Sequence, residues 1–157
     1  MNDTLLRSTF IVGDLEAAIR FYSEVFGWQV AYDNILAVDY RFPPAAPDGA
    51  PCRLVIFRGA DPEIGGIGFM QYLHHNPPPG PSKHRKTVGQ GEAILVVKSD
   101  DPDASYEKIR KTDAVVVAPP TDWTVPSPVK GQVIRLRTLS LFDPNGIYIE
   151  VNLKYPD

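Results

Sequence analysis

The sequence predicts an α+β fold in which two βαβββ modules form a curved mixed sheet around a cavity. The main observation is an order of strand, helix and several strands that occurs twice along 157 residues. The second observation is that both helices begin at an aspartate directly after a strand-like segment. We expect one domain over residues 1–157, with a first module at about 1–75, a loop at 76–91 and a second module at about 92–157.

The first module begins with a strand-like segment, "LLRSTFIV", and continues with the helix in "GDLEAAIRFYSEVFGW". Asp14 is a candidate N-cap, Glu16 lies in the first turn where the helix dipole favours an acid, and Gly27 ends the helix. Four strand-like segments follow, "WQVAYDN", "ILAVDYRF", "CRLVIF" and "IGFMQYL".

The connection "HHNPPPGPSKHRKTVGQGE" is rich in proline and glycine, which is typical of a linker or of a loop over a cleft. Its basic run from Ser82 to Lys86 is interpreted as solvated surface.

The second module repeats the order of the first. A strand in "EAILVVK" precedes a helix with Asp101 as its cap and Pro102 as its first residue, and the strands "AVVVA", "QVIRLRTLSLF" and "IYIEVNL" follow. A loop around Trp123 separates the first two of these strands. The turn from Asp143 to Gly146 precedes the last strand, in which Glu150 lies on the opposite face from Ile149.

The two halves also close alike, with "GIGFMQYL" in one and "GIYIEVNL" in the other. A repeat of about 80 residues exceeds the roughly 20 to 50 residues of a solenoid unit, so duplication of one βαβββ half is the better explanation. The alternative is an accidental similarity between two αβ units.

Composition excludes several classes of partner. The net charge of −3 gives no general attraction to nucleic acid. The sequence shows no signal-peptide pattern and no apolar run of about 20 residues, so we expect a cytoplasmic protein without a membrane partner. Cys52 is the only cysteine, which excludes an intrachain disulfide, and its setting is that of a packed strand residue.

Four motifs in order resemble the vicinal oxygen chelate superfamily, which contains glyoxalases, bleomycin-resistance proteins and extradiol dioxygenases. They are "VGDLEAAIRFYSEVFGW", "GIGFMQ", "VKSDDPDASYEKI" and "FDPNGIYIEVN". The resemblance spans nearly the whole chain and implies an open barrel of two modules, a small-molecule ligand and a homodimer.

The resemblance also implies a metal site on the inward faces of four strands, and this sequence departs from it. The four positions carry Arg7, Gln71, Ile94 and Glu150, of which only Glu150 matches the metal-bearing relatives. Arg7 is a permanent cation and Ile94 has no donor atom. We therefore expect no metal or other cofactor, with a divalent metal on Gln71, His75 and Glu150 as the alternative.

A buried carboxylate needs a partner, because an isolated charge in an apolar site is costly. The implied layout brings Arg7 beside Glu150, so we predict an ion pair between them with Gln71 hydrogen-bonded to it. The alternative is that Arg7 faces solvent and Glu150 is an ordinary strand residue.

Three functions are compatible with this pocket. The first is a metal-independent lyase or isomerase in which Glu150 or Glu92 moves a proton and Arg7 stabilises an oxyanion. The second is sequestration of an aromatic or hydrophobic compound without catalysis. The third is metal-dependent lyase or dioxygenase chemistry with replaced ligands. Arg135 and Arg137 could clamp an anionic group, and the further expected ligand-binding residues are Thr9, Gln71, Tyr40, Phe57, Phe69, Ile94, Trp123 and Tyr148.

Overall fold

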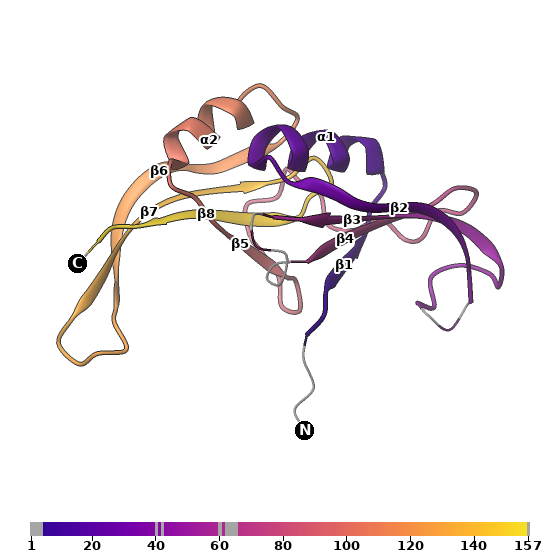
Figure 1. The fold of residues 1–157 in the computed structure, drawn as a ribbon, viewed down its shortest axis with the longest axis horizontal. Helices are drawn as coiled ribbons and strands as arrows, with labels where there is room; N and C mark the ends of the chain where they lie inside the picture. The colour runs from indigo at the N-terminus through magenta and orange to yellow at the C-terminus, as the bar shows by residue number, and fades with distance from the viewer. Residues whose placement is uncertain (1–4, 40, 42, 60, 62–65, 157) are drawn as a thin grey trace. The chain divides into compact units, whose positions relative to one another are not determined.

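The computed structural model describes residues 5–39, 41, 43–59, 61 and 66–156. It divides into two compact units, residues 1–80 and 81–157. Each unit contains one helix and one mixed four-stranded sheet, so the predicted α+β class with two modules is confirmed (Figure 1). None of the helices in the described ranges is long and apolar enough to cross a membrane.

The first unit has the order βαβββ. Its elements are β1 (Ser8–Ile11), α1 (Leu15–Phe26), β2 (Gln29–Val38), β3 (Ala50–Arg58) and β4 (Ile67–Tyr72). The strand order in the sheet is β1-β4-β3-β2, with β1 parallel to β4 and the other neighbours antiparallel. Residues 28–42 were expected to contain two strands, but β2 continues through Asn34 and Ile35 because both pair with β3.

The predicted signals at both ends of α1 are confirmed. The Asp14 side chain accepts a hydrogen bond from the Ala17 backbone N–H at 2.9 Å, and Gly27 ends the helix with a φ of 69°. The buried stripe of α1 packs on one face of the sheet, where the ring of Tyr22 lies 4.7 Å from the ring of Phe69. Phe57 and Phe69 are both fully buried on this face.

A charged cluster borders this face. Arg53 on β3 makes two hydrogen bonds to Asp33 on β2, at 2.8 and 2.7 Å, and a further one to Glu16 on α1. The Arg53 guanidinium holds the pKa of Asp33 below its ordinary value. The cluster therefore ties the start of α1 to two strands through one cation.

The second unit repeats the order. Its elements are β5 (Ile94–Lys98), α2 (Pro102–Ile109), β6 (Val115–Pro126), β7 (Val133–Phe142) and β8 (Tyr148–Lys154). The strand order is β5-β8-β7-β6, with β5 parallel to β8. Asp101 caps α2 by accepting from the Ala104 N–H at 2.9 Å, as predicted. Leu139, Leu141, Ile149 and Val151 form the core with Ile109 of α2.

β6 is longer than the sequence suggested. Trp123 was expected in a loop, but it lies within β6, in register with Leu136 of β7. The prolines at 119 and 120 are accommodated by irregular pairing between Ala118 and Thr121, because β6 is an edge strand whose outer side needs no ladder donors.

The basic run at 82–86 is not simply solvated surface, because Arg85 anchors residues 81–92 to β7 and to the turn before β8 within the second unit. Its side chain is 18% exposed and its guanidinium lies 4.2 Å from the centre of the Phe142 ring. It donates to the Gly146 carbonyl at 3.0 Å and to the Glu92 carboxylate at 3.1 Å. The charge pattern alone does not reveal this packing, since the partners come from the turn before β8.

Candidate functional site

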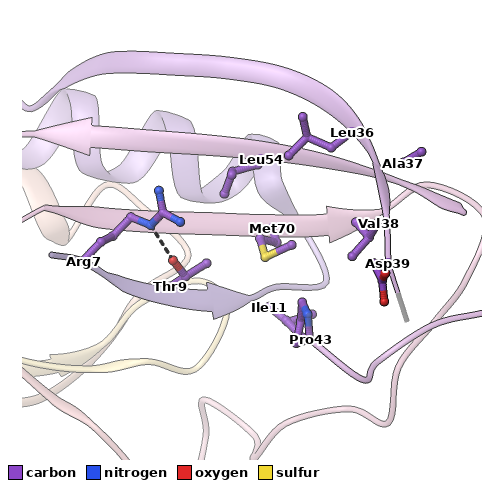
Figure 2. A pocket seen from close by; sticks show the side chains of 10 residues that line it. All are labelled: Arg7, Thr9, Ile11, Leu36, Ala37, Val38, Asp39, Pro43, Leu54 and Met70. Atoms are coloured by element: carbon purple, nitrogen blue, oxygen red, sulfur yellow. Dashed lines mark hydrogen bonds between the residues drawn. The ribbon is translucent and has the colours of Figure 1, made fainter. Parts of the chain in front are cut away.

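A cavity of the first unit lies on the face of the sheet opposite α1. It has a volume of about 530 Å³ and is lined by ten residues: Arg7, Thr9, Ile11, Leu36, Ala37, Val38, Asp39, Pro43, Leu54 and Met70. Figure 2 shows Arg7 and Thr9 at one end, Leu54 and Met70 in the middle, and Val38, Asp39 and Pro43 at the other end. We call this cavity the Arg7 pocket.

One side chain fixes the position of the Arg7 guanidinium. Its Nε donates to Thr9 Oγ1 at 2.9 Å, a bond drawn in Figure 2. Neither Nη1 nor Nη2 of Arg7 has a hydrogen bond or ion pair to any described residue. Since an arginine carries five N–H donors, most of its donors remain available at this end of the pocket.

Gly68 leaves the space that the arginine occupies. It lies opposite Thr9 in the parallel pairing of β1 with β4. A Cβ at this position would lie 2.9 Å from Thr9 Oγ1 and 3.2 Å from Arg7 Cδ. The absence of a side chain at residue 68 therefore allows Arg7 and Thr9 to lie across the sheet.

The middle of the Arg7 pocket is apolar. Leu54 and Met70 are each 8% exposed and belong to a buried cluster with Val38, Cys52 and Tyr72. Burial raises the pKa of the Cys52 thiol, so the only cysteine stays protonated in this cluster, as expected for a packed strand residue. The pocket thus combines a hydrocarbon floor with one positively charged end.

Asp39 at the opposite end is already paired. Its carboxylate accepts from Arg41 Nε at 2.9 Å and from Arg41 Nη2 at 2.7 Å, and these hydrogen bonds hold its pKa below the ordinary value. An ionised carboxylate held in this way is a poor proton acceptor at neutral pH. Tyr40, which the sequence placed among the ligand-binding residues, lies outside the described residues.

Three predicted site residues of the first unit lie on the other face of its sheet. Phe57 and Phe69 pack under α1. Gln71 Oε1 accepts from the Leu15 N–H at 3.1 Å, and its Nε2 donates to the Gly13 carbonyl at 2.7 Å. The prediction that Gln71 would face Arg7 is therefore wrong, because neighbouring residues of a strand alternate between faces and Met70 takes the pocket side.

Gln71 and His75 both line a second cavity of about 280 Å³. The His75 ring contacts the Tyr72 ring edge-on with 6.2 Å between centres. The alternative metal set joined these two residues to Glu150, which belongs to the other unit. The amide of Gln71 is instead hydrogen-bonded to the first turn of α1.

In the second unit, Glu150 lies on the sheet face opposite the α2 core. Ile94 pairs with Tyr148, and Val96 pairs with Glu150, so these side chains share that face. Ile94 is 50% exposed and Val96 is 64% exposed. No hydrogen bond or ion pair joins the Glu150 carboxylate to another described residue of this unit. The predicted Arg7–Glu150 ion pair joins the two units and stays a prediction.

Glu92 does not have the surroundings expected of a proton-transfer residue. Its Oε1 accepts from Arg85, and its Oε2 accepts from the Gly89 N–H. The side chain is only 22% exposed. This carboxylate closes the anchored segment 81–92, so its two oxygens are already engaged in local structure.

The proposed arginine clamp on β7 is also engaged. Arg137 makes two hydrogen bonds to Asp103 at the start of α2, at 2.7 and 2.8 Å, and one to Asp122 at 3.1 Å. Arg135 donates to the Pro156 carbonyl at 3.2 Å and lies over the Tyr155 ring. The N–H groups of Arg137 that would bind an anionic ligand are therefore hydrogen-bonded to carboxylates of the chain itself.

The side chains do not match the metal site that the four-strand layout implies. Arg7 repels a divalent cation, Gln71 faces α1, and Ile94 has no donor atom. Within the part of the chain that the structure describes, no three His, Cys, Asp or Glu residues are grouped as metal ligands. The donor set at these four positions therefore does not fit a divalent metal.

Sequence reasoning missed most of the Arg7 pocket. Leu36, Val38, Leu54 and Met70 were read only as strand residues. The pairing of β1 with β4 could have found Met70. In this register Gly68 and Met70 lie on the same side of the sheet as the Arg7 side chain.

The model of the glyoxalase/bleomycin resistance protein/dioxygenase superfamily matches residues 4–151 of this chain. A search of curated protein sequences finds no match. Three solved structures of different proteins are similar to this chain. A glyoxalase family protein from Bacillus cereus has a TM-score of 0.69 and 17% identity, covering 98% of this chain and 97% of the other. Glyoxalase I from Leishmania major has a TM-score of 0.59 and 16% identity, covering 96% and 86%. The fosfomycin resistance protein FosX from Mesorhizobium loti has a TM-score of 0.55 and 20% identity, covering 97% and 92%.

Proposed function

The chain belongs to the glyoxalase/bleomycin resistance protein/dioxygenase superfamily, and we propose that it binds a small organic anion with an apolar tail in the Arg7 pocket without a metal ion. The observation that carries this proposal is the guanidinium of Arg7, whose Nη groups have no partner among the described residues, at the end of a hydrocarbon-lined cavity.

The shape of the charge distribution supports an anion. Thr9 holds Nε of Arg7, which leaves the two Nη groups as a fork for a carboxylate or a similar oxyanion. Leu54 and Met70 then contact the apolar part of the ligand. Asp39 is neutralised by Arg41, so it does not cancel the attraction at the opposite end.

Binding of hexanoate to the purified protein tests the proposal. Hexanoate carries a carboxylate on a flexible hydrocarbon chain, and hexanol carries the same chain without the charge. We expect calorimetry to show that Arg7→Gln weakens hexanoate binding by about tenfold, the equivalent of about 1.4 kcal/mol for a lost charge-assisted hydrogen bond. Hexanol binding should change by less than about twofold, because the apolar floor is unchanged.

Arg20→Gln is the matched control. Arg20 is an exposed arginine of α1, which packs on the opposite face of the sheet from the pocket. Its substitution removes the same net charge without touching the pocket. Equal losses of hexanoate affinity in the two variants would reduce the effect of Arg7 to general charge and contradict the proposal.

A metal-independent lyase or isomerase is the second candidate. It is favoured by Glu150, whose carboxylate lies on an exposed sheet face without a partner among the described residues of its own unit. A carboxylate that is not committed to an ion pair is available to accept a proton from a bound substrate. In this function Glu150 moves the proton, whereas the carboxylate of Glu92 is already hydrogen-bonded to Arg85.

Glu150→Gln separates catalysis from sequestration. The amide keeps the size of the side chain and removes its basicity. Loss of turnover of an identified substrate, with unchanged affinity, supports the enzymatic function. Ligands that the wild-type protein binds and never converts support sequestration. A rise in melting temperature without turnover also supports sequestration. The homodimer and the cytoplasmic location stay predictions, and sedimentation at two protein concentrations tests the first.

A further inference from the structure

A chain of three hydrogen-bonded side chains crosses the Glu150 face of the second unit. Trp123 Nε1 donates to Thr138 Oγ1 at 2.6 Å, and Thr138 Oγ1 donates to Asn152 Oδ1 at 2.6 Å. The three residues come from β6, β7 and β8, which are neighbours in the sheet. Thr138 and Asn152 are directly paired in the register of β7 with β8.

Trp123 sets the direction of these two hydrogen bonds. An indole N–H can only donate, so Thr138 Oγ1 must accept from it. The single hydroxyl proton of Thr138 is then free to go to Asn152, where it requires the carbonyl oxygen of the amide. Both protons of Asn152 Nδ2 consequently remain, and Nδ2 has no partner among the described residues.

Asn152 stands two residues after Glu150, so the two side chains emerge from the same face of β8. The face therefore presents a fixed hydrogen-bond donor beside a hydrogen-bond acceptor. Lys98 pairs with Asn152 from β5 and adds an exposed cation at the same edge. A ligand group that accepts and donates through neighbouring atoms satisfies Asn152 and Glu150 together, and a carboxylate does not, because it has no proton to give to Glu150.

We propose that Asn152 is a ligand-binding residue that receives the carbonyl oxygen of a carboxamide group, whose N–H is received by Glu150. Thr138 and Trp123 are positioning residues that hold the amide of Asn152 in this orientation. The site uses residues of the second unit alone and does not depend on anion binding by Arg7. Trp123 is 47% exposed, and its hydrogen bond to Thr138 makes it the first member of this series of hydrogen bonds.

Benzamide is the probe for this site, and benzoate controls for attraction of charge to Lys98. Nuclear magnetic resonance of the isotope-labelled full chain follows the side-chain NH₂ signals of Asn152, which are assigned by their loss in Asn152→Asp. We expect benzamide to shift these signals, and benzoate to leave them unchanged. Thr138→Val removes the hydroxyl that orients the amide, and should weaken benzamide binding by about fivefold to tenfold.

Thr121→Val is the matched control, because Thr121 pairs with Thr138 in the register of β6 with β7 but donates to the Pro119 carbonyl instead. Its affinity for benzamide should equal that of the wild type. Trp123→Phe supplies a second test that keeps Thr138 in place: the hydroxyl loses its donor partner, and binding should weaken in the same direction as in Thr138→Val.

Three results would overturn the proposal. One is equal affinity for benzamide in Thr138→Val and Thr121→Val. Another is an equal shift of the Asn152 signals by benzoate, which would assign the effect to charge. The third is the absence of any shift with benzamide near its solubility limit. Failure of hexanoate to distinguish Arg7→Gln has no bearing on these outcomes, since none of them involves the Arg7 pocket.

Discussion

Replacing Gly68 with alanine should weaken anion binding without removing any charge. The added Cβ would lie 2.9 Å from Thr9 Oγ1, 3.2 Å from Arg7 Cδ and 3.4 Å from Arg7 Nε. Contacts this short force the two side chains apart, and Thr9 can then no longer hold the guanidinium at 2.9 Å. The arginine remains charged, but its position at the end of the pocket is lost.

The magnitude follows from the hydrogen bond that is broken. An exposed bond of this kind contributes about 1 kcal/mol, so hexanoate affinity should fall roughly fivefold. The fold should tolerate the change, because the crowded atoms belong to side chains and an alanine in a strand gains about 0.5 to 1 kcal/mol over glycine. We therefore expect the free energy of unfolding in urea to change by less than about 1 kcal/mol.

Calorimetry with hexanoate and a urea titration are run on Gly68→Ala and on Gly13→Ala. A Cβ on Gly13 has no neighbour within 4 Å, so that variant controls for a glycine substitution in the same unit. Wild-type affinity in Gly68→Ala would refute the idea that Thr9 positions Arg7 for an anion. A large loss of stability in Gly68→Ala would show that the crowding falls on the backbone instead.

Three further predictions concern stability and pH. Gly146→Ala should destabilise the protein by about 2 to 4 kcal/mol in urea titrations, because its φ is 87° and an added Cβ would lie 2.7 Å from the Pro81 carbonyl oxygen. Gly131→Ala, with a φ of 81° and open space, should show only the smaller backbone cost of about 1 to 2 kcal/mol, and equal losses would contradict the close packing of residues 81–92. Phe69→Ala should cost about 3 to 5 kcal/mol, since the ring is fully buried beneath α1, and a loss below about 1 kcal/mol would place that ring elsewhere. The Arg53 ion pair lowers the pKa of Asp33 below 3.8, so its contribution is present at neutral pH and is lost as the pH falls below about 3.8 through the lowered value. The stability difference between the wild type and Asp33→Asn should therefore shrink from pH 7 to pH 3, and a constant difference would exclude this linkage.

Local signals in the sequence predicted the helices well. Asp14 and Asp101 are N-caps, and Gly27 is a left-handed C-cap, because each depends only on residues within one turn. The alternation around Glu150 was also confirmed, with Ile149 in the core and Glu150 on the opposite face. The duplicated βαβββ order followed from these local patterns.

The faces of the first sheet were harder to predict, since they depend on pairing between distant segments. Gln71 and Met70 are neighbours in β4, and only the register with β1 decides which one shares the side of Arg7. An error of one residue in this register placed Gln71 on the pocket side of the sheet, whereas it lies on the side of α1. Phe57 and Phe69 were misplaced for the same reason, as aromatic residues suit both a core and a pocket.

Arg85 and Glu92 were misjudged for a different reason. A basic run in a proline-rich loop is usually solvated, and the sequence offers no local sign that one of its cations packs on an aromatic ring. The relevant partners, Phe142 and Gly146, lie more than fifty residues away along the chain. Gly146 indicates that another backbone segment can approach closely, because it is a turn glycine with positive φ. It does not indicate which segment approaches.

Arg7 is central to the proposed function. We propose that it binds an anion, and it occupies one of the four positions at which the family resemblance implies a metal ligand. The most direct measurement is calorimetric binding of hexanoate to protein that has been stripped of metal with a chelator, repeated after addition of zinc or nickel. We predict the same affinity in both samples and about a tenfold loss in Arg7→Gln. Binding that appears only with added metal, and that survives Arg7→Gln, would contradict this role of Arg7.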